Sequence, residues 1–136
     1  MSGMCVRVRV GREQYALDVA HVSEVDELGE TTPVPGAPRG VSGVRNVRGQ
    51  VVPVIDLATM LGIAGEARAE RVVIAEDGPR RAALAVHEVN DVEEAPEPTE
   101  QSDSPLVSGV ALVDGTLVGM IDLPAVLSAA TAEAGA

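Results

Sequence analysis

Two aspartates, two histidines and one cysteine are the residues of this chain whose side chains could carry out chemistry. Asp56 and Asp122 could form a two-carboxylate site for acid and base catalysis. Each of them, however, comes directly before a leucine at the start of a short apolar run. Because aspartate is among the residues preferred at the N-cap of a helix, we predict that both aspartates cap short helices.

The remaining candidates do not form a catalytic or metal-binding pattern. His21 and His87 belong to no cluster with the ligand spacing of a metal site. Cys5 has no histidine partner in a nucleophile motif, and as the single cysteine it excludes an intramolecular disulfide. Glycine motifs for nucleotides and a serine nucleophile elbow are also missing from the sequence. We therefore predict a protein that is not an enzyme and uses no metal or cofactor. The alternative is a small enzyme or ligand-binding barrel in which Asp56, His21 or His87 meet in a cleft.

Asp56 and Asp122 occupy equivalent positions of an internal repeat. Residues 43–61 return 66 positions later as residues 109–127, with nine of the nineteen residues identical. The similarity continues upstream, where residues 16–25 match residues 83–92 with one residue of slip. Residues at equivalent positions of the two copies are called repeat mates below. A period this long exceeds the roughly 20–50 residues of solenoid repeats, so two similar subdomains are the better interpretation.

Composition and charge exclude several classes of function. The chain has 136 residues, a formal net charge of −11 and Tyr15 as its one aromatic residue. All ten arginines precede residue 82, there is no lysine, and residues 82–136 carry ten acidic side chains. A nucleic-acid partner would need a basic stripe with stacking aromatics, so we expect none. Arg7, Arg9 and Arg12 interrupt the apolar N-terminal residues, and we expect neither a signal segment nor membrane insertion, but a soluble cytoplasmic protein.

The elements that must position these residues are mostly strands. Residues 6–10 alternate between valine and arginine, which is typical of a half-buried strand, and a turn over residues 11–13 leads into a second strand. Residues 20–25 fit a single helical turn or a bent strand equally well. Residues 43–47 and 51–55 form a second hairpin around Arg48-Gly49, followed by a short helix that ends near Gly62. Many short strands with glycine and proline turns predict a mainly β, barrel-like architecture.

The repeat predicts the organisation of a single domain over residues 1–136. We expect subdomain 1 over about residues 4–61 and subdomain 2 over about residues 70–127, with residues 62–71 as their connector. Residues 93–105 contain three prolines and five acidic side chains, which indicates a loop. Residues 128–136 form a C-terminal tail. Each half alone has a small core without aromatics, so the two halves must share one.

Residues 43–57 also carry a family resemblance. An Asn-apolar-Arg-Gly turn at residues 46–49 precedes a Val-Pro-apolar-apolar-Asp-Leu strand at residues 52–57, and this pattern resembles the signature of CheW, the adaptor of bacterial chemotaxis. Residues 11–19, 22–25 and 33–38 resemble the family in the same order, so the similarity covers about residues 4–127. The family often has aspartate where His87 stands, and the segment 93–106 is shorter than usual.

The resemblance implies two five-stranded, SH3-like β-barrels with short helices, and a scaffold without enzymatic activity. Its implied partners are the regulatory domain of the histidine kinase CheA, which would contact each barrel, and the cytoplasmic tip of methyl-accepting chemoreceptors. The receptor's helical hairpin would lie in the groove between the barrels, and some relatives form rings with copies of themselves. A CheW-like adaptor in a non-chemotactic array, for surface motility or cyclic-di-GMP control, is the alternative function.

Six residues are candidates for binding these partners: Arg48, Glu24, Val22, Gly43, Asn46 and Val47. The repeat mate of Arg48 is Asp114, so the turn itself does not require a cation. The resemblance implies that Arg48 pairs with Glu24. An exposed ion pair contributes little to stability, whereas arginine is common at interface hot spots, and this favours a binding role. Glu24 has the mate Asp91, which leaves a structural role open, and Val22 would belong either to the core or to the receptor groove.

Overall fold

The computed structural model describes residues 3–63 and 68–132 of the chain. In these residues ten strands form most of the structure, and the helices are short. The elements follow in the order β1 (Met4–Val10), β2 (Glu13–Asp18), the 3-10 turn η1 (Val19–His21), β3 (Val22–Glu27), β4 (Val41–Val47), β5 (Gln50–Asp56), α1 (Leu57–Leu61), β6 (Arg71–Asp77), β7 (Arg80–Val86), β8 (Glu88–Glu94), β9 (Val107–Val113), β10 (Thr116–Ile121) and α2 (Leu123–Ala132).

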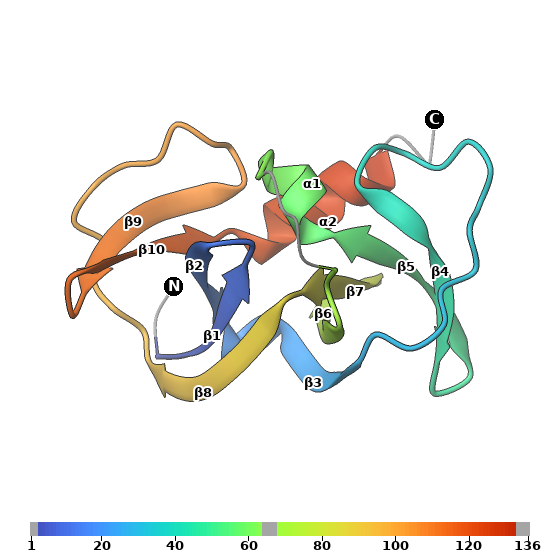
Figure 1. Cartoon of the computed structure of the whole chain (residues 1–136), viewed down its shortest axis with the longest axis horizontal. Coiled ribbons are helices and arrows are strands. Elements are labelled where there is room, and N and C mark those ends of the chain that lie inside the picture. The colour runs from blue at the N-terminus through green and yellow to red at the C-terminus, as the bar shows by residue number, and fades with distance from the viewer. Residues whose placement is uncertain (1–2, 64–67, 133–136) are drawn as a thin grey trace.

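The strands form two five-stranded sheets, which confirms the prediction of a mainly β fold with two similar halves. Sheet A has the strand order β8-β1-β2-β10-β9, and sheet B has the order β3-β6-β7-β5-β4. Every strand of sheet A is the repeat equivalent of the strand at the same place in sheet B. Figure 1 shows sheet A on the left and sheet B on the right, with α1 and α2 between them.

The sheets divide the chain differently from the expected subdomains over residues 4–61 and 70–127. The β1–β2 hairpin of the first copy lies in sheet A with β8, β9 and β10, and the β6–β7 hairpin of the second copy lies in sheet B with β3, β4 and β5. The two copies have thus exchanged their first hairpins. Parallel pairing joins each exchanged hairpin to its host sheet, with Met120 opposite Ala16 and Val54 opposite Ala83. These two residue pairs are themselves repeat mates.

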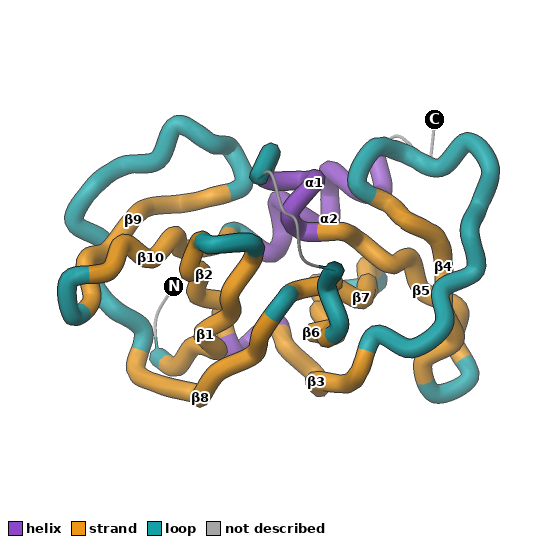
Figure 2. Tube along the Cα trace, in the orientation of Figure 1, coloured by secondary structure: helices purple, strands orange, loops and turns teal. Residues whose placement is uncertain are grey.

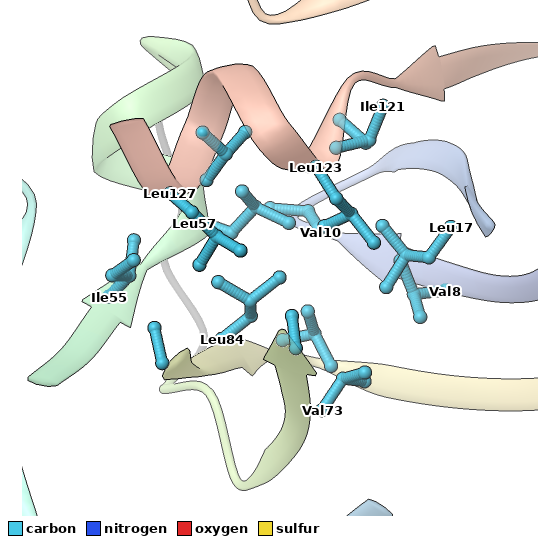
Figure 3. Packing of buried hydrophobic residues seen from close by; sticks show 14 of the residues in the cluster. Val8, Val10, Leu17, Ile55, Leu57, Val73, Leu84, Ile121, Leu123 and Leu127 are labelled. Atoms are coloured by element: carbon cyan, nitrogen blue, oxygen red, sulfur yellow. The ribbon is translucent and has the colours of Figure 1, made fainter. Parts of the chain in front are cut away.

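The exchange gives the two halves a shared core. Figure 3 shows apolar side chains from the exchanged hairpins and from both helices meeting between the sheets. The labelled members are Val8, Val10, Leu17, Ile55, Leu57, Val73, Leu84, Ile121, Leu123 and Leu127. Each sheet also has a smaller core of its own, with Val52 and Ile74 in sheet B and Val118 and Met120 in sheet A. Most of the apolar burial therefore holds the two sheets to each other, which agrees with the marginal core of either half alone.

Local sequence explains how the elements begin and end. In β1, Val6, Val8 and Val10 are buried while Arg7 and Arg9 are partly exposed, as the alternation predicts. The two readings left open for residues 20–25 both apply, because η1 is a single helical turn and β3 follows it directly. α1 ends at Gly62, which adopts the left-handed conformation with φ 71°.

The two aspartates predicted as helix caps behave differently. Asp122 accepts a hydrogen bond from the backbone amide of Ala125 at 3.1 Å, which caps α2. Asp56 occupies the N-cap position of α1, but its carboxylate makes no bond to the helix backbone. It accepts instead from the hydroxyl of Thr59 at 2.8 Å.

Two long loops pair with the outer edges of the sheets. Figure 2 shows residues 28–40 beside sheet B and residues 95–106 beside sheet A. Thr32 pairs with Val44, and Glu100 pairs with Val110, which is the repeat mate of Val44. In the acidic segment 93–105, the first two residues therefore belong to β8 and the centre is hydrogen-bonded to β9. Residues 64–67 of the connector and 133–136 of the tail lie outside the described residues.

Candidate functional site

Arg48 and Glu24 are in direct contact on the surface of sheet B. Arg48 is in the β4–β5 turn with φ 50°, and its Nε donates to Oε2 of Glu24 in β3 at 2.7 Å. The Arg48 side chain is 74% exposed and that of Glu24 25% exposed. The hydrogen bond and the charge of Glu24 raise the pKa of Arg48 further above its ordinary value. The contact places a cation, held in one direction, at an exposed position.

The Arg48 contact closes sheet B on itself. Strands β3 and β4 are at opposite edges of this sheet, yet Arg48 and Arg45 both reach from the β4 side to β3. Arg45 donates to the carbonyl oxygens of Glu27 and Leu28 at 2.8 Å each, and lies 3.4 Å from Asp26. The two arginines therefore join the edges of the sheet in the manner of a barrel.

Sheet A lacks these arginine contacts. The repeat mates of Arg48 and Glu24 are Asp114 and Asp91, which are both acidic, and the mate of Arg45 is the buried Ala111. The sequence interpretation missed Arg45. The sequence did contain a signal for it, because the charged Arg45 of the first copy stands where the second copy has the small apolar Ala111.

Three of the other candidate residues shape the β4–β5 hairpin. Asn46 is exposed, and its side-chain oxygen accepts from the backbone amide of Gly49 at 2.9 Å, which fixes the turn that carries Arg48. Val47 is only 5% exposed and packs in the core of sheet B. Gly43 is buried, and a Cβ there would clash with the carbonyl oxygen of Thr32. Val47 and Gly43 are thus both buried. The Val47 side chain fills the core of sheet B, and glycine is needed at position 43 because the 28–40 loop approaches closely there.

Val22 lies at the junction of the two sheets. It starts β3, packs partly against the shared core and is two residues from Glu24. The chain passes from sheet A to sheet B at β3 and returns to sheet A at β8, which begins one residue after His87. In Figure 1 both β3 and β8 run along the lower side of the molecule.

Exposed valines lie on β3 and β8, the two strands at which the chain passes from one sheet to the other. Val25 in β3 is 37% exposed, and its repeat mate Val92 in β8 is 56% exposed. Val19 in η1 adds a third apolar side chain, which is 36% exposed. Together with Val22 these residues are called the crossing-strand surface below. Only Val22 of this set was among the residues predicted from the sequence.

The groups proposed for an enzyme do not assemble into a reactive set. Asp56 and His87 line one pocket of about 530 Å³. Within it the Asp56 carboxylate binds the Thr59 hydroxyl, and His87 Nδ1 accepts from the backbone amide of Gly11 at 2.9 Å. His21 is elsewhere, with Nδ1 3.0 Å from a backbone carbonyl oxygen of β6. These polar atoms hold neighbouring segments together, so the enzyme alternative has no supporting arrangement.

In residues 3–63 and 68–132, no three His, Cys, Asp or Glu side chains come together as ligands for a metal ion would. No helix of that part of the chain is long and apolar enough to cross a bilayer. The described residues instead expose the Arg48–Glu24 ion pair and several valines on the segments between the two sheets. Such a surface suits a protein-binding module.

Comparison with known proteins gives this class a family. The family model of the CheW-like domain matches residues 4–131. The chain is 28% identical over 139 aligned residues to the chemotaxis protein CheW of Rhizobium meliloti, covering 95% of this chain and 90% of that protein. It is 30% identical to the probable chemotaxis protein CheW of Rhizobium etli with the same coverage. The crystal structure of the scaffolding protein TtCheW from Thermoanaerobacter tengcongensis matches with a TM-score of 0.77 and 30% identity over 90% of each chain.

The chain therefore belongs to the CheW-like domain family. Proteins of this family are adaptors without enzymatic activity, and this chain is one of them. The resemblance first found in residues 43–57 is confirmed over nearly the whole chain.

Proposed function

We propose that this protein is a cytoplasmic scaffold that couples chemoreceptors to the histidine kinase CheA in bacterial chemotaxis. The observation that carries the proposal is the exposed Arg48–Glu24 pair in a chain of the CheW-like family. Glu24 lies in β3, and Arg48 lies in the β4–β5 turn. β3 also carries Val22 and Val25 of the crossing-strand surface.

The crossing-strand surface is the proposed site for the receptor. Val22 and Val25 in β3, Val92 in β8 and Val19 in η1 offer apolar side chains along the segments where the chain passes between the sheets. A helical hairpin can place the apolar face of a helix on such a strip, with anchors spaced three or four residues apart. Glu24 is on the same strand, but its place opposite Ile74 in β6 turns it to the other face from Val25, which is opposite Val73.

CheA is proposed to bind the outer surfaces of the sheets. Arg48 is 74% exposed and is held in place by Glu24 and by the turn that Asn46 fixes, so its side chain is ordered before a partner arrives. An ordered arginine loses less conformational entropy on binding than a free one. We propose sheet B with Arg48 as one CheA interface and sheet A as another.

A binding titration with purified components tests the proposal. The protein is titrated by calorimetry with the CheA regulatory domain and, separately, with a helical hairpin from a receptor tip. We expect saturable binding to both at up to tens of micromolar, a range suited to transient signalling contacts. If neither partner binds in that range, the scaffold proposal is rejected. Because residues 82–136 are strongly acidic, at least one association should slow as salt rises.

The same titration separates the two kinds of signalling array. Receptors and kinases encoded with a chemotaxis system are compared with those of surface-motility or cyclic-di-GMP systems from the same genome. Preference for the chemotaxis set is the outcome we expect. Preference for another set would keep the scaffold role and assign it to a non-chemotactic array.

A further inference from the structure

Two exposed leucines on the β9–β10 hairpin form an apolar pair that the fold does not need. Leu112 and Leu117 are directly opposite each other in the ladder, so their side chains lie on the same face. They are 61% and 57% exposed, which are among the largest values for apolar side chains in the described chain. Their repeat mates are Asn46 and Val51. Since the equivalent hairpin forms with an asparagine at one of these places, the turn does not require the leucine pair.

A small pocket continues this face toward the middle of sheet A. It has a volume of about 240 Å³, and Leu117 is one of its lining residues. Tyr15 lies across Gly119, where a Cβ would come within 2.7 Å of the tyrosine ring. Val110 and Leu61 complete much of the apolar lining. The volume is below the roughly 300–1,000 Å³ of sites for small molecules and suits one inserted side chain.

The equivalent place in sheet B has different residues. Tyr15 and Gly119 have the mates Ala82 and Pro53, which supply neither the ring nor the space above it. The only aromatic side chain of the protein is thus placed beside an exposed apolar pair on sheet A. The hairpin lies at the left edge of the molecule in Figure 1; β8 is at the opposite edge of sheet A from β9, and β3 belongs to sheet B.

The one charged residue among those that line the pocket is acidic. Glu13 lines it, Asp114 is in the exposed turn next to the leucines, and Glu100 and Asp103 are in the loop that runs along β9. From residue 82 onward the sequence contains no lysine or arginine. A second copy of this chain would bring the same acidic face and a further net charge of −11, which opposes self-association.

We propose that this face of sheet A binds a basic segment of another protein, which inserts one apolar side chain between Tyr15 and the Leu112–Leu117 pair. The apolar side chain would cover the exposed leucines, and flanking lysines or arginines would meet Glu13 and Asp114. This surface is separate from the crossing-strand surface and from Arg48, but it lies on sheet A, where the proposed function also places a CheA contact. The inference rests on the pocket and the leucine pair and goes beyond that proposal, because the peptide titration below succeeds or fails without CheA.

Nuclear magnetic resonance of the labelled full chain tests the inference. The probe is a short peptide of lysines and alanines with one central phenylalanine. We expect saturable shifts of the amide signals of Tyr15, Val110, Leu117 and Gly119, and weaker binding at higher salt. In the double variant Leu112→Ser, Leu117→Ser the affinity should fall about tenfold or more. The matched control is Val51→Ser, which changes the exposed mate of Leu117 and should leave binding unchanged.

Three results would overturn it. If a peptide with serine in place of phenylalanine binds with equal affinity, this face recognises charge alone. Shifts centred on β3 and β8 would place the peptide on the crossing-strand surface instead. Dimerisation of the free protein that the double leucine variant abolishes would make a second copy the occupant.

Discussion

Arg48 directly follows β4 and Glu24 lies in β3, at the opposite edge of sheet B, and their 2.7 Å contact joins those edges on the surface of the protein. Asp114, the repeat mate of Arg48, has the same left-handed backbone, with φ 49° against 50°. The turn therefore accepts an acidic residue at this position, and the cation is explained by what it contacts. With 74% of its side chain exposed, Arg48 adds little to stability and remains available to a partner.

Replacing Arg48 with aspartate should weaken binding and leave the fold intact. Arg48→Asp copies the residue that the second repeat has at the same φ, and aspartate tolerates the left-handed region better than most residues. We expect a cooperative melting transition close to that of the wild type, and reduced affinity for the CheA regulatory domain in a calorimetric titration.

A charge exchange shows whether the ion pair or the cation is recognised. In the double variant Arg48→Glu, Glu24→Arg the pair is restored with its ends reversed. Recovery of affinity in this variant would mean that the partner requires an ion pair at this place but not a cation at position 48. We expect no recovery, because the proposal places the cation itself in contact with the partner. Loss of the melting transition in Arg48→Asp would show instead that Arg48 is structural.

Arg45 should matter more to stability than Arg48. Its side chain is 15% exposed and donates to two carbonyl oxygens in addition to its contact with Asp26. Arg45→Ala removes charged hydrogen bonds that are each worth about 1.5–3 kcal/mol, of which the one to Leu28 is partly buried. We expect a loss of about 2–3 kcal/mol in the free energy of unfolding, measured by urea denaturation. An Arg45→Ala variant as stable as the wild type would contradict the view that Arg45 closes the sheet.

Gly43 and Gly109 are repeat mates that should respond differently to alanine. A Cβ at Gly43 would clash with the backbone of Thr32, whereas one at Gly109 would come within 2.9 Å of the Pro98 side chain. Backbone yields less than a side chain, so Gly43→Ala should cost about 1–3 kcal/mol and Gly109→Ala less. Denaturant unfolding of the two variants measures the difference, and equal losses would argue against the close approach of the 28–40 loop to Gly43.

The buried thiol of Cys5 should make stability fall at alkaline pH. Burial, and secondarily the charge of Glu93, raise the pKa of Cys5 above its ordinary value of 9.0. Above about pH 9 the unfolded chain therefore releases this proton before the folded chain does, so the free energy of unfolding decreases until the raised pKa is passed. The contribution is complete at neutral pH.

A Cys5→Ala variant isolates this effect. Its small cavity lowers stability equally at every pH, so only the slope is compared between pH 8 and 10 by urea unfolding. We expect a shallower decrease in the variant than in the wild type. The pKa of Tyr15 is also raised by burial, and its effect begins at higher pH and is present in both proteins. Parallel curves would show that Cys5 ionises as easily in the folded state as in the unfolded chain.

The sequence predicts most of the strands and hairpins, but not which strands pair across the two copies. Alternation in residues 6–10 and the turn residues located the hairpins, and the repeat indicated two equivalent halves. Similarity between copies shows which residues are equivalent, but not which copy they pair with. The parallel contacts of Ala16 with Met120 and of Ala83 with Val54 join strands of different copies, and no local pattern distinguishes them from pairing within one copy.

The candidate site was predicted in part for the same reason. The contact of Arg48 with Glu24 was implied by the family resemblance, and the structure contains it. Val47 is buried because it lies on the face of β4 that packs against the core. The mixed apolar and polar residues of this short strand do not show which face that is. Val25 and Val92 lie on the strands at which the chain changes sheets, and the sequence does not show where those changes occur.

The central claim is that one molecule of this protein holds a receptor and CheA at the same time. The direct measurement immobilises the CheA regulatory domain and follows capture of a labelled receptor-tip hairpin, with and without the adaptor. We expect capture only when the adaptor is present, rising to a maximum and then falling as excess adaptor separates the two partners. Binding of each partner alone, with the hairpin displacing CheA from the adaptor, would contradict the account, because it would place both partners on one surface.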